Sequence, residues 1–366
     1  MGSMITLGVD KLDIDWGKND SFVNHSALFL PSDVGLIPYY YADDVVEIKE
    51  GFSRTLNSIK RRLDLLGYSF QALPRKYDEY LDLVPDCDPD VAISFEQIRS
   101  IVSSIELEKV SLDSEYRCTF FENLEPYLIL RLFAENEKNA NHCVQWRFAD
   151  VVDGGWVGRD EISTPLPDAL TILVVTEGSS DSFIIERAMA ALCPDIADFF
   201  HFVDMEEHYP FTGTGNLFRF CQGLSRIKIQ NNVLVIFDND AAGVEKFEQS
   251  RNLNRPKNLH ICRLPDHEFF SSFKTIGPNG ASKENINGSA VAIECFLDLS
   301  TISESDSCVR WTSYNRELQR YQGEIEGKDG LVRAFKNANL TNGSYDTSRL
   351  KFLLDYLVGE WVENAA

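Results

Sequence analysis

Two stretches of the sequence, Thr171-Ile-Leu-Val-Val-Thr-Glu-Gly-Ser-Ser-Asp-Ser-Phe-Ile184 and Val233-Leu-Val-Ile-Phe-Asp-Asn-Asp-Ala-Ala-Gly243, decide the fold. Each is an apolar, largely β-branched run that ends in acidic residues and a glycine. Such a run is typical of a strand that is buried on both faces of a parallel sheet. The carboxyl ends of parallel strands meet at one edge, where α/β proteins form their ligand crevice. We therefore expect the chemistry of this chain at that edge.

The segments around these two strands alternate between strand and helix patterns. Apolar residues recur at helical spacing in three segments, and short apolar runs separate them. The predicted helices cover Asp181–Leu192, Gly213–Ile227 and Ala241–Ser250, and the later predicted strands cover His201–Val203, Asn232–Phe237 and Leu259–Leu264. The order βαβαβαβ predicts an α/β fold with a mostly parallel sheet and helices on both faces. No glycine-rich phosphate loop follows these strands, so nucleotide binding through a P-loop or a GxGxxG turn is not supported.

Three acidic residues, Glu177, Asp238 and Asp240, come directly after the two buried strands. Carboxylates that converge on one edge repel one another unless a cation neutralises them. Hard divalent cations bind several carboxylate oxygens, and Asp-x-Asp at a strand end places two carboxylates around one ion. Glu177 can complete such a site or act as a general base. A structural alternative stays open, because Ser180, Asp181 and Asp240 also fit the N-cap positions of the following helices.

The ordered pair of motifs resembles the Toprim domain, named for topoisomerases and primases, over residues 168–265. The form Glu177-Gly-x-x-Asp181 is more similar to the Toprim nucleases of the OLD (overcoming lysogenisation defect) branch than to topoisomerases. In OLD-like nucleases a downstream acid and a lysine join the site. The resemblance thus implies Mg²⁺ or Mn²⁺ as the cofactor, catalytic roles for Glu177, Asp238, Asp240 and Lys328, and metal ligation by Glu177, Asp181, Asp238, Asp240 and Glu294.

The function implied by this resemblance is a divalent-metal-dependent nuclease, a hydrolase that cleaves phosphodiester bonds of DNA, RNA or tRNA. The bacterial context of the family suggests an effector in anti-phage defence. The alternative is a non-catalytic Toprim-fold module that regulates or binds another protein. Primase and topoisomerase functions rank lower, since no zinc ribbon precedes the domain and the chain lacks room for strand-passage domains. The sequence leaves the choice between DNA and RNA open, and also the activating trigger.

The first 150 residues predict an α+β domain of a different kind. Short strands are expected at Ile5–Val9, Leu12–Trp16 and Ser26–Leu30, a long amphipathic helix at Val45–Leu66, and further helices at Lys76–Leu83 and Ser94–Ser103. The stretch Leu7–Asn19, with Pro38-Tyr-Tyr-Tyr41, resembles an N-terminal domain that is associated with HEPN and Toprim modules in bacterial proteins. The glycines and prolines of residues 150–167 mark a boundary. We expect an N-terminal domain over residues 1–155, a Toprim core over 168–265 and a helical C-terminal extension over 266–366 that completes the Toprim domain.

Composition places this chain among ordinary globular proteins. Its 366 residues are 44% hydrophobic and 25% charged, which is enough for sizeable cores in more than one domain. No apolar run approaches the ~18 residues that a membrane span requires. The eight cysteines are scattered without a Cys-x-x-Cys pair, which favours reduced thiols and a cytoplasmic location.

The net charge of −22 argues against nucleic-acid binding through bulk electrostatics, because phosphate contacts normally rely on excess Lys and Arg. Any contact must therefore be local. The first candidates are Lys60, Arg61 and Arg62, and further candidates are Arg219, Arg226 and Lys228, together with Arg316, Arg320 and Lys328. The expected partner is a nucleic-acid substrate, and no membrane is expected. A protein partner in a defence complex and a homo-oligomer stay open, since an acidic surface can also serve a basic partner.

Overall fold

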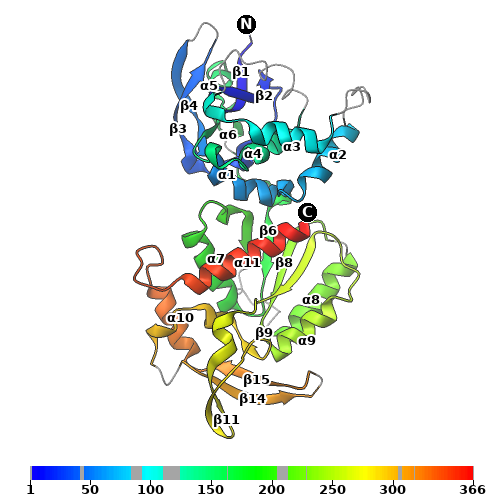
Figure 1. Ribbon diagram of the computed structural model, residues 1–366, viewed down its shortest axis with the longest axis vertical. Coiled ribbons are helices and arrows are strands. Elements are labelled where there is room, and N and C mark those ends of the chain that lie inside the picture. The colour runs from blue at the N-terminus through cyan, green and yellow to red at the C-terminus, as the bar shows by residue number, and fades with distance from the viewer. Residues whose placement is uncertain are drawn as a thin grey trace. The chain divides into compact units, whose positions relative to one another are not determined.

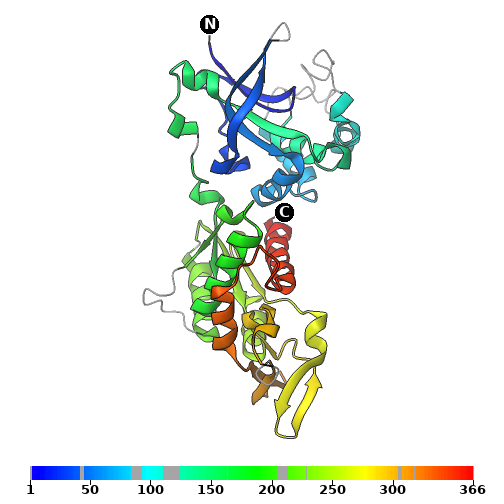
Figure 2. The same cartoon turned by 90° about the vertical axis from the view of Figure 1, so that its left-hand side faces the viewer.

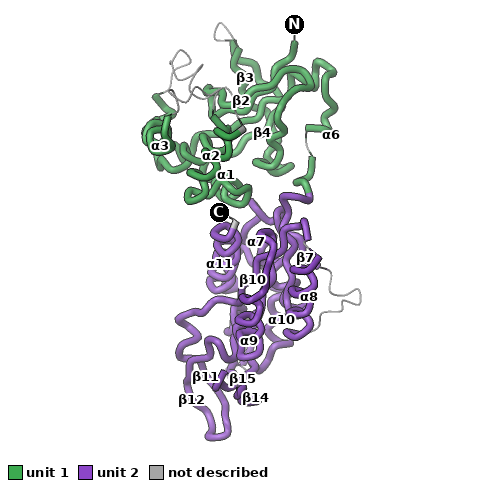
Figure 3. Tube along the Cα trace, turned by 90° about the vertical axis from the view of Figure 1, so that its right-hand side faces the viewer, with its two compact units in different colours: residues 1–167, 366 green, residues 168–365 purple. Residues whose placement is uncertain are grey.

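The computed structural model describes residues 2–41, 45–83, 93–109, 124–162, 164–203, 213–227, 229–303, 307–316 and 318–365. The chain divides into two compact units, residues 1–167 with residue 366 and residues 168–365, which Figure 3 shows in green and purple. Each unit has its own sheet and hydrophobic core. Among the described residues, no helix is long and apolar enough to cross a membrane.

The first unit contains a five-stranded antiparallel sheet in the order β2-β1-β5-β4-β3. Its strands are β1 (Met4–Val9), β2 (Leu12–Lys18), β3 (Val34–Tyr40), β4 (Val46–Thr55) and β5 (Cys143–Arg147). Its helices are α1 (Leu56–Leu63), α2 (Leu73–Leu83), α3 (Phe95–Ser104), α4 (Pro126–Phe133), α5 (Ala149–Asp153) and α6 (Arg159–Ile162). Figure 1 shows α1 to α4 gathered beside the sheet. The unit is therefore α+β, as the sequence predicts.

The core of the first unit lies on one face of this sheet. Leu7 and Val9 on β1 are two positions apart and belong to the buried cluster, as expected when every second side chain of a strand points to the same face. Phe52 and Trp146 lie opposite each other on β4 and β5, and their rings stack with centroids 5.9 Å apart. Helix α4 contributes Leu128, Ile129, Leu132 and other fully buried side chains to the same cluster. Burial of this apolar surface holds α1, α3 and α4 against the sheet.

Two sequence predictions for this unit are wrong. Ser26–Leu28 is a short 3-10 helix and not a strand. The predicted helix over Val45–Leu66 is largely a strand, since β4 extends to Thr55 and α1 begins only at Leu56. Val46 and Ile48 are 52% and 61% exposed on β4, so their apolar pattern did not report a buried helix face. Hydrogen-bonded pairing with β3 and β5, and not the local sequence propensity, determines that β4 is a strand.

The second unit is built on a four-stranded parallel sheet in the order β10-β8-β6-β7. Its strands are β6 (Ile172–Val175), β7 (Phe200–Phe202), β8 (Asn232–Phe237) and β10 (Leu259–Arg263), and its helices include α7 (Ser179–Leu192), α8 (Thr214–Ile227) and α9 (Ala241–Ser250). All these elements agree with the predicted ones to within two residues, which confirms the α/β class with a parallel sheet. Helices α8 and α9 lie on the opposite side of the sheet from α7 (Figure 1).

Residues after 265 add more than helices to this unit. A second sheet, in the order β12-β11-β14-β15, consists of β11 (Phe273–Gly277), β12 (Gly280–Glu284), β14 (Val309–Asn315) and β15 (Arg320–Ile325). A short bridge joins β9 (Asn239–Asp240) to β13 (Ala290–Val291). Two helices follow, α10 (Lys328–Asn337) and α11 (Ser348–Ala365), shown in orange and red in Figure 2. The prediction of a purely helical extension is therefore wrong.

Candidate active site

Glu177 lies just beyond the carboxyl end of β6, and Asp238 lies just beyond the end of the adjacent strand β8. The N–H of Asp238 donates to Glu177 Oε1 at 3.0 Å, so the two strand ends are joined directly. The hydroxyl of Thr214, the first residue of α8, donates to Glu177 Oε2 at 2.5 Å. These two donors fix the Glu177 carboxylate in one orientation at the edge of the parallel sheet. This is the edge at which the sequence predicts the chemistry.

Asp240 begins helix α9 and faces the same edge. Its Oδ1 accepts from the Gly243 N–H at 2.7 Å as a helix cap, and its Oδ2 accepts from Gln322 Nε2 at 2.5 Å. A Cβ atom at Gly243 would overlap the carbonyl oxygen of Asp238, so only glycine allows the helix to start this close to the strand end. The Ala-Ala-Gly sequence after Asp-x-Asp thus positions both aspartates.

Asp181 lies in the first turn of α7, where its Oδ2 accepts from the Gly178 N–H at 2.9 Å. The predicted N-cap position holds for Asp240, whereas the N-cap of α7 is Gly178 and Asp181 supports it from the third position of that helix. Capping does not account for Asp238, because no hydrogen-bond donor within the described ranges contacts its carboxylate, and the residue keeps partial access to solvent. Capping alone leaves this central acid unexplained.

Two residues from beyond the parallel sheet join the cluster. Glu294 is 5% exposed in a 3-10 helix, Ile293–Phe296, and Lys328 is the first residue of α10. The charge of Glu294 acts on Asp181 and Asp238, and Lys328 interacts electrostatically with Glu294 and Asp238. The structure therefore brings all six predicted site residues of the second unit into one electrostatic cluster.

The pKa values of the acids are displaced toward neutrality. Burial raises the pKa of Glu177 from 4.5 to about 7, against the hydrogen bonds from Thr214 and the Asp238 N–H. Burial, then the charges of Glu294 and Glu177, raises the pKa of Asp181 to about 7. Burial and the neighbouring carboxylates raise the pKa of Asp238 well above its usual value, and burial also raises that of Asp240. Ionising these groups together is therefore costly without a neutralising cation.

Lys328 supplies one positive charge to this cluster. Burial acts to lower its pKa, but the carboxylates of Glu294 and Asp238 outweigh burial, and the pKa lies above the usual value. One ammonium group faces five carboxylates, Glu177, Asp181, Asp238, Asp240 and Glu294. Charge balance at neutral pH thus requires bound protons or a further cation.

The orientation of the side chains matters for metal binding. Within the part of the chain that the structure describes, no three His, Cys, Asp or Glu side chains are arranged to hold a metal ion. Glu177, Asp181 and Asp240 each point at least one oxygen toward a protein donor. The donor set itself, carboxylate oxygens without His or Cys, suits Mg²⁺ or Mn²⁺.

The predicted nucleic-acid contact on α1 does not form as a basic surface. Arg62 is fully buried, and its Nε donates to the Ala27 carbonyl at 2.8 Å, so the prediction for Arg62 is wrong. Lys60 pairs with Glu135 at 3.0 Å, which offsets its charge. Arg61 stays half-buried on the same helix. These three residues are adjacent in the sequence, but consecutive residues of a helix point in different directions, and Arg62 turns into the core.

Sequence reasoning missed two neighbours of the acids. Thr214 stands in the Gly-Thr-Gly sequence at the start of α8, and this sequence was the available signal for it. Gln322 lies on β15, 82 positions after Asp240, and a single glutamine in a polar strand carries no local signal. Lys228, a further basic candidate, lies outside the described residues.

Comparison with known proteins bears on the first unit. Residues 1–169 match a family model described as HEPN/Toprim N-terminal domain 1. The match ends near Pro167, where the first compact unit ends. It supports a HEPN/Toprim-associated domain in this part of the chain, as its motifs predict. No curated protein and no solved structure matches the chain.

Proposed function

We propose that this protein is a divalent-metal-dependent nuclease whose active site lies at the carboxyl edge of the β6–β8 sheet. The observation that carries the proposal is the joining of Glu177 to Asp238 across adjacent parallel strands, with Asp181, Asp240, Glu294 and Lys328 clustered around them. The arrangement fits a Toprim-type site of the OLD-like kind. The HEPN/Toprim-associated N-terminal domain supports this assignment, because it accompanies Toprim modules.

Each residue has a distinct role in the proposed mechanism. Asp238 and Asp240, with Asp181 and Glu294, would hold Mg²⁺ or Mn²⁺, which would supply Lewis-acid stabilisation of the phosphodiester and lower the pKa of a water. Glu177 has a pKa near neutrality and two fixed donors, so it is suited to accept the proton of the attacking water. Lys328 would stabilise negative charge on the phosphate that is attacked.

The second sheet, rather than α1, is the part of the protein that we propose to contact the phosphates of the substrate. Arg316 and Arg320 are exposed at the turn and start of the β14–β15 hairpin. The same hairpin carries Gln322, which touches Asp240. The substrate is nucleic acid, and its class, DNA or RNA, is decided by the experiment below. A role in anti-phage defence is part of this proposal and rests on the family resemblance.

A non-catalytic protein-binding module is the second candidate. It is favoured by the capping roles of Asp181 and Asp240 and by carboxylates that point toward protein donors. In that case the raised pKa values would keep the cluster protonated and compact without a metal. The two candidate functions differ in whether the activity of the protein needs the negative charge of these carboxylates.

The deciding experiment is incubation with Mg²⁺ or Mn²⁺ and plasmid, single-stranded DNA or total tRNA as separate substrates. Asp238→Asn keeps the shape of the side chain and removes its charge. Glu248→Gln makes the same chemical change on α9 at a 53% exposed side chain that pairs with Arg251, and serves as the matched control. We expect cleavage by the wild type and by Glu248→Gln, and none by Asp238→Asn. No activity in any of the three proteins would favour the second candidate, and equal activity in all three would contradict the assignment of Asp238 to the active site.

A further inference from the structure

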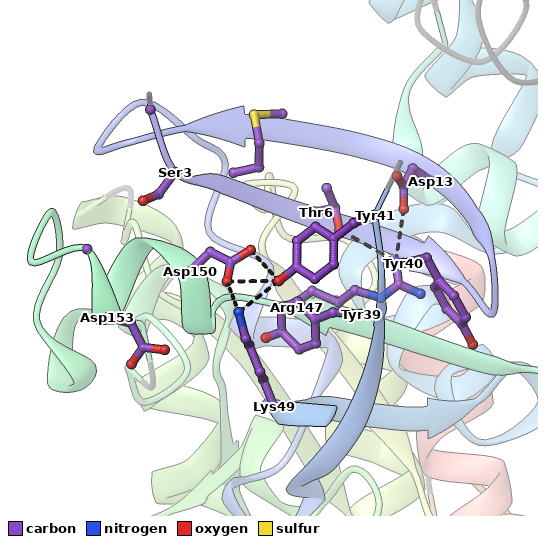
Figure 4. Close-up of a pocket in the computed structure, with 13 residues that line it drawn as sticks. Ser3, Thr6, Asp13, Tyr39, Tyr40, Tyr41, Lys49, Arg147, Asp150 and Asp153 are labelled. Carbon is purple, nitrogen blue, oxygen red and sulfur yellow. Dashed lines mark hydrogen bonds and ion pairs between the residues drawn. The ribbon is translucent and has the colours of Figure 1, made fainter. Parts of the chain in front are cut away.

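A pocket of about 610 Å³ in the first unit is not suited to nucleic acid, although basic and aromatic side chains line it. Its two basic groups are already paired, since Lys49 Nζ donates to Asp150 Oδ1 at 2.8 Å and Arg147 Nη1 donates to Asp13 Oδ1 at 2.9 Å (Figure 4). The Arg147 guanidinium also lies 5.0 Å from the centre of the Tyr40 ring. A phosphate or a base would have to displace these contacts. A surface for nucleic acid is therefore to be sought in the second unit.

The β14–β15 hairpin of the second unit carries three aromatic rings on one face. Tyr314 and Tyr321 pair directly across the two strands, and their rings are in contact with centroids 5.0 Å apart. The centre of the Trp311 ring lies 5.9 Å from that of Tyr321. Trp311 pairs with Gly323, which is two positions from Tyr321 on β15, so all three rings share one face of the hairpin.

The tyrosine pair of this row is open to solvent. Tyr314 and Tyr321 are each 50% exposed. Trp311 is held more firmly, because a Cβ atom at Gly323 would lie 2.8 Å from its ring and only glycine leaves room for the indole against β15. Single exposed aromatic side chains are common, but exposed rings that gather at one place point to a binding surface. The hairpin thus presents fixed, accessible ring faces.

Two arginines lie at the end of the hairpin, next to the tyrosine pair. Arg316 follows β14 directly, and Arg320 is the first residue of β15. Both are exposed, and neither makes an ion pair or a side-chain hydrogen bond with a described residue. Residues 309–325 contain three arginines and two glutamates, a net charge of 3 − 2 = +1 in a chain of net charge −22. This segment can therefore attract phosphate groups locally.

The hairpin is joined to the candidate active site. Strand β15 lies beside the start of α9 (Figure 1), and Gln322 Nε2 on this strand donates to Asp240 Oδ2 at 2.5 Å. The charge of Arg320 acts on Asp266, whose Oδ1 accepts from Asn239 Nδ2 at 2.8 Å. Asn239 is the middle residue of the Asp-x-Asp motif. Nucleic acid at the end of the hairpin would therefore lie next to the acidic cluster.

We propose that the β14–β15 hairpin binds single-stranded nucleic acid beside the bond to be cleaved, with bases stacked on Tyr314 and Tyr321 and phosphates at Arg316 and Arg320. Aromatic side chains stack on the open base faces of a single strand, whereas neighbouring bases cover these faces in a duplex. The proposal rests on the proposed nuclease function, because it names the substrate class of that site. Single-stranded DNA and RNA share this chemistry, and the test separates them.

The test measures the binding of fluorescent oligonucleotides to the full chain by anisotropy. Asp238→Asn and EDTA both prevent the proposed cleavage, so the probes stay intact. The probes are a single DNA strand of about 12 nucleotides, within the size range of single-strand sites, its RNA counterpart, the matching DNA duplex, and a DNA strand of the same charge with abasic nucleotides. We expect the single strands to bind more tightly than the duplex and the abasic strand. The tighter of the DNA and RNA strands assigns the sugar of the substrate.

Variants in the same background separate stacking from charge. Tyr314→Leu and Tyr321→Leu, each alone, should weaken binding of the single strand at least about five-fold, and should leave binding of the abasic strand unchanged because no base can stack. Tyr321→Phe keeps the ring face and should bind like its parent. Arg316→Gln should weaken both strands equally and reduce the slope of log K against log salt by about 0.7. Trp16→Leu, at a 55% exposed ring on β2, is the matched control and should have no effect.

Three results would overturn the proposal: no binding of single strands, duplex binding that is as tight, or tyrosine variants that weaken the base-bearing and abasic strands equally. The same loss in Trp16→Leu would also overturn it. Cleavage by the wild type without base-dependent binding at the tyrosines would overturn the hairpin proposal and leave the nuclease function standing. Base-dependent binding at Tyr314 and Tyr321 without any cleavage would support the hairpin as a single-strand binding site and overturn the nuclease function.

Discussion

Replacing Glu177 by Gln should stabilise the metal-free protein at high pH. Burial raises the pKa of Glu177 from 4.5 to about 7, so the folded state binds its proton more tightly than the unfolded state. Stability from this group is complete below the unfolded pKa and is lost as pH rises through the folded pKa. Above about pH 8 the ionised Glu177 therefore costs about 3 kcal/mol, since a pKa difference of one between the two states corresponds to about 1.4 kcal/mol. Gln cannot ionise, yet its carbonyl can still accept from the Asp238 N–H.

The assay is urea denaturation of wild type and Glu177→Gln at about pH 5 and about pH 8.5, with EDTA and then with Mg²⁺. The difference in the free energy of unfolding between the two proteins is free of the titration of unrelated groups, because those groups titrate alike in both. We expect near-equal stability at the lower pH and a gain of about 3 kcal/mol for the variant at the higher pH. Removing the charge of Glu177 also lowers the pKa values of Asp181 and Asp238, which adds to this gain where those groups ionise.

Magnesium should reduce this difference in stability between the two proteins. A ligand at 100 times its Kd stabilises the folded state by about 2.7 kcal/mol, and the wild type should gain more of this than the variant. The stabilisation by Mg²⁺ should grow with pH, because the cation and protons compete for the same carboxylates. A Glu177→Gln protein that is less stable than the wild type at both pH values without metal would refute the reasoning. It would mean that Glu177 is held in the folded state by favourable pairing rather than by unfavourable burial.

Four further predictions follow from the same geometry. Thr214→Val should move the acidic limb of the pH–activity profile upward by about 0.5–1 pH unit, because it removes a hydrogen bond that lowers the pKa of Glu177. Gly243→Ala should cost about 1–3 kcal/mol of stability and reduce cleavage, whereas Gly223→Ala, with open space around it on α8, should be neutral or stabilising in thermal melts. Arg62→Met should destabilise the first unit by about 1–3 kcal/mol and leave nucleic-acid binding unchanged in a salt titration. Cleavage should depend on Mg²⁺ or Mn²⁺ and persist in a zinc-selective chelator, since the proposed ligands are all oxygens.

The parallel sheet was predictable because its signal is local. Strand β8 and helix α9 occupy the predicted residues, since a strand buried on both faces must be an unbroken apolar run and a helix after it begins at a capping acid. The second sheet had no such signal. Every residue of β12 is exposed, so no apolar pattern marks it as a strand. The same limit explains β4, whose exposed Ile48 imitates a helix face.

The residues after 265 take part in the candidate site. Gln322 on β15 donates to Asp240 and also accepts from the Ala242 N–H at 3.0 Å, so one side chain holds both the acid and the start of α9. Glu294 and Lys328 enter the cluster from the same part of the chain. A fragment that ended after β10 would keep the strand-end acids but would lose the ammonium group that offsets them and the amide that orients Asp240. Local sequence patterns therefore supply the acids. Their charge balance and orientation come from tertiary contacts with residues about 50 to 150 positions later in the chain, the separations between Asp238 and Glu294 and between Glu177 and Lys328.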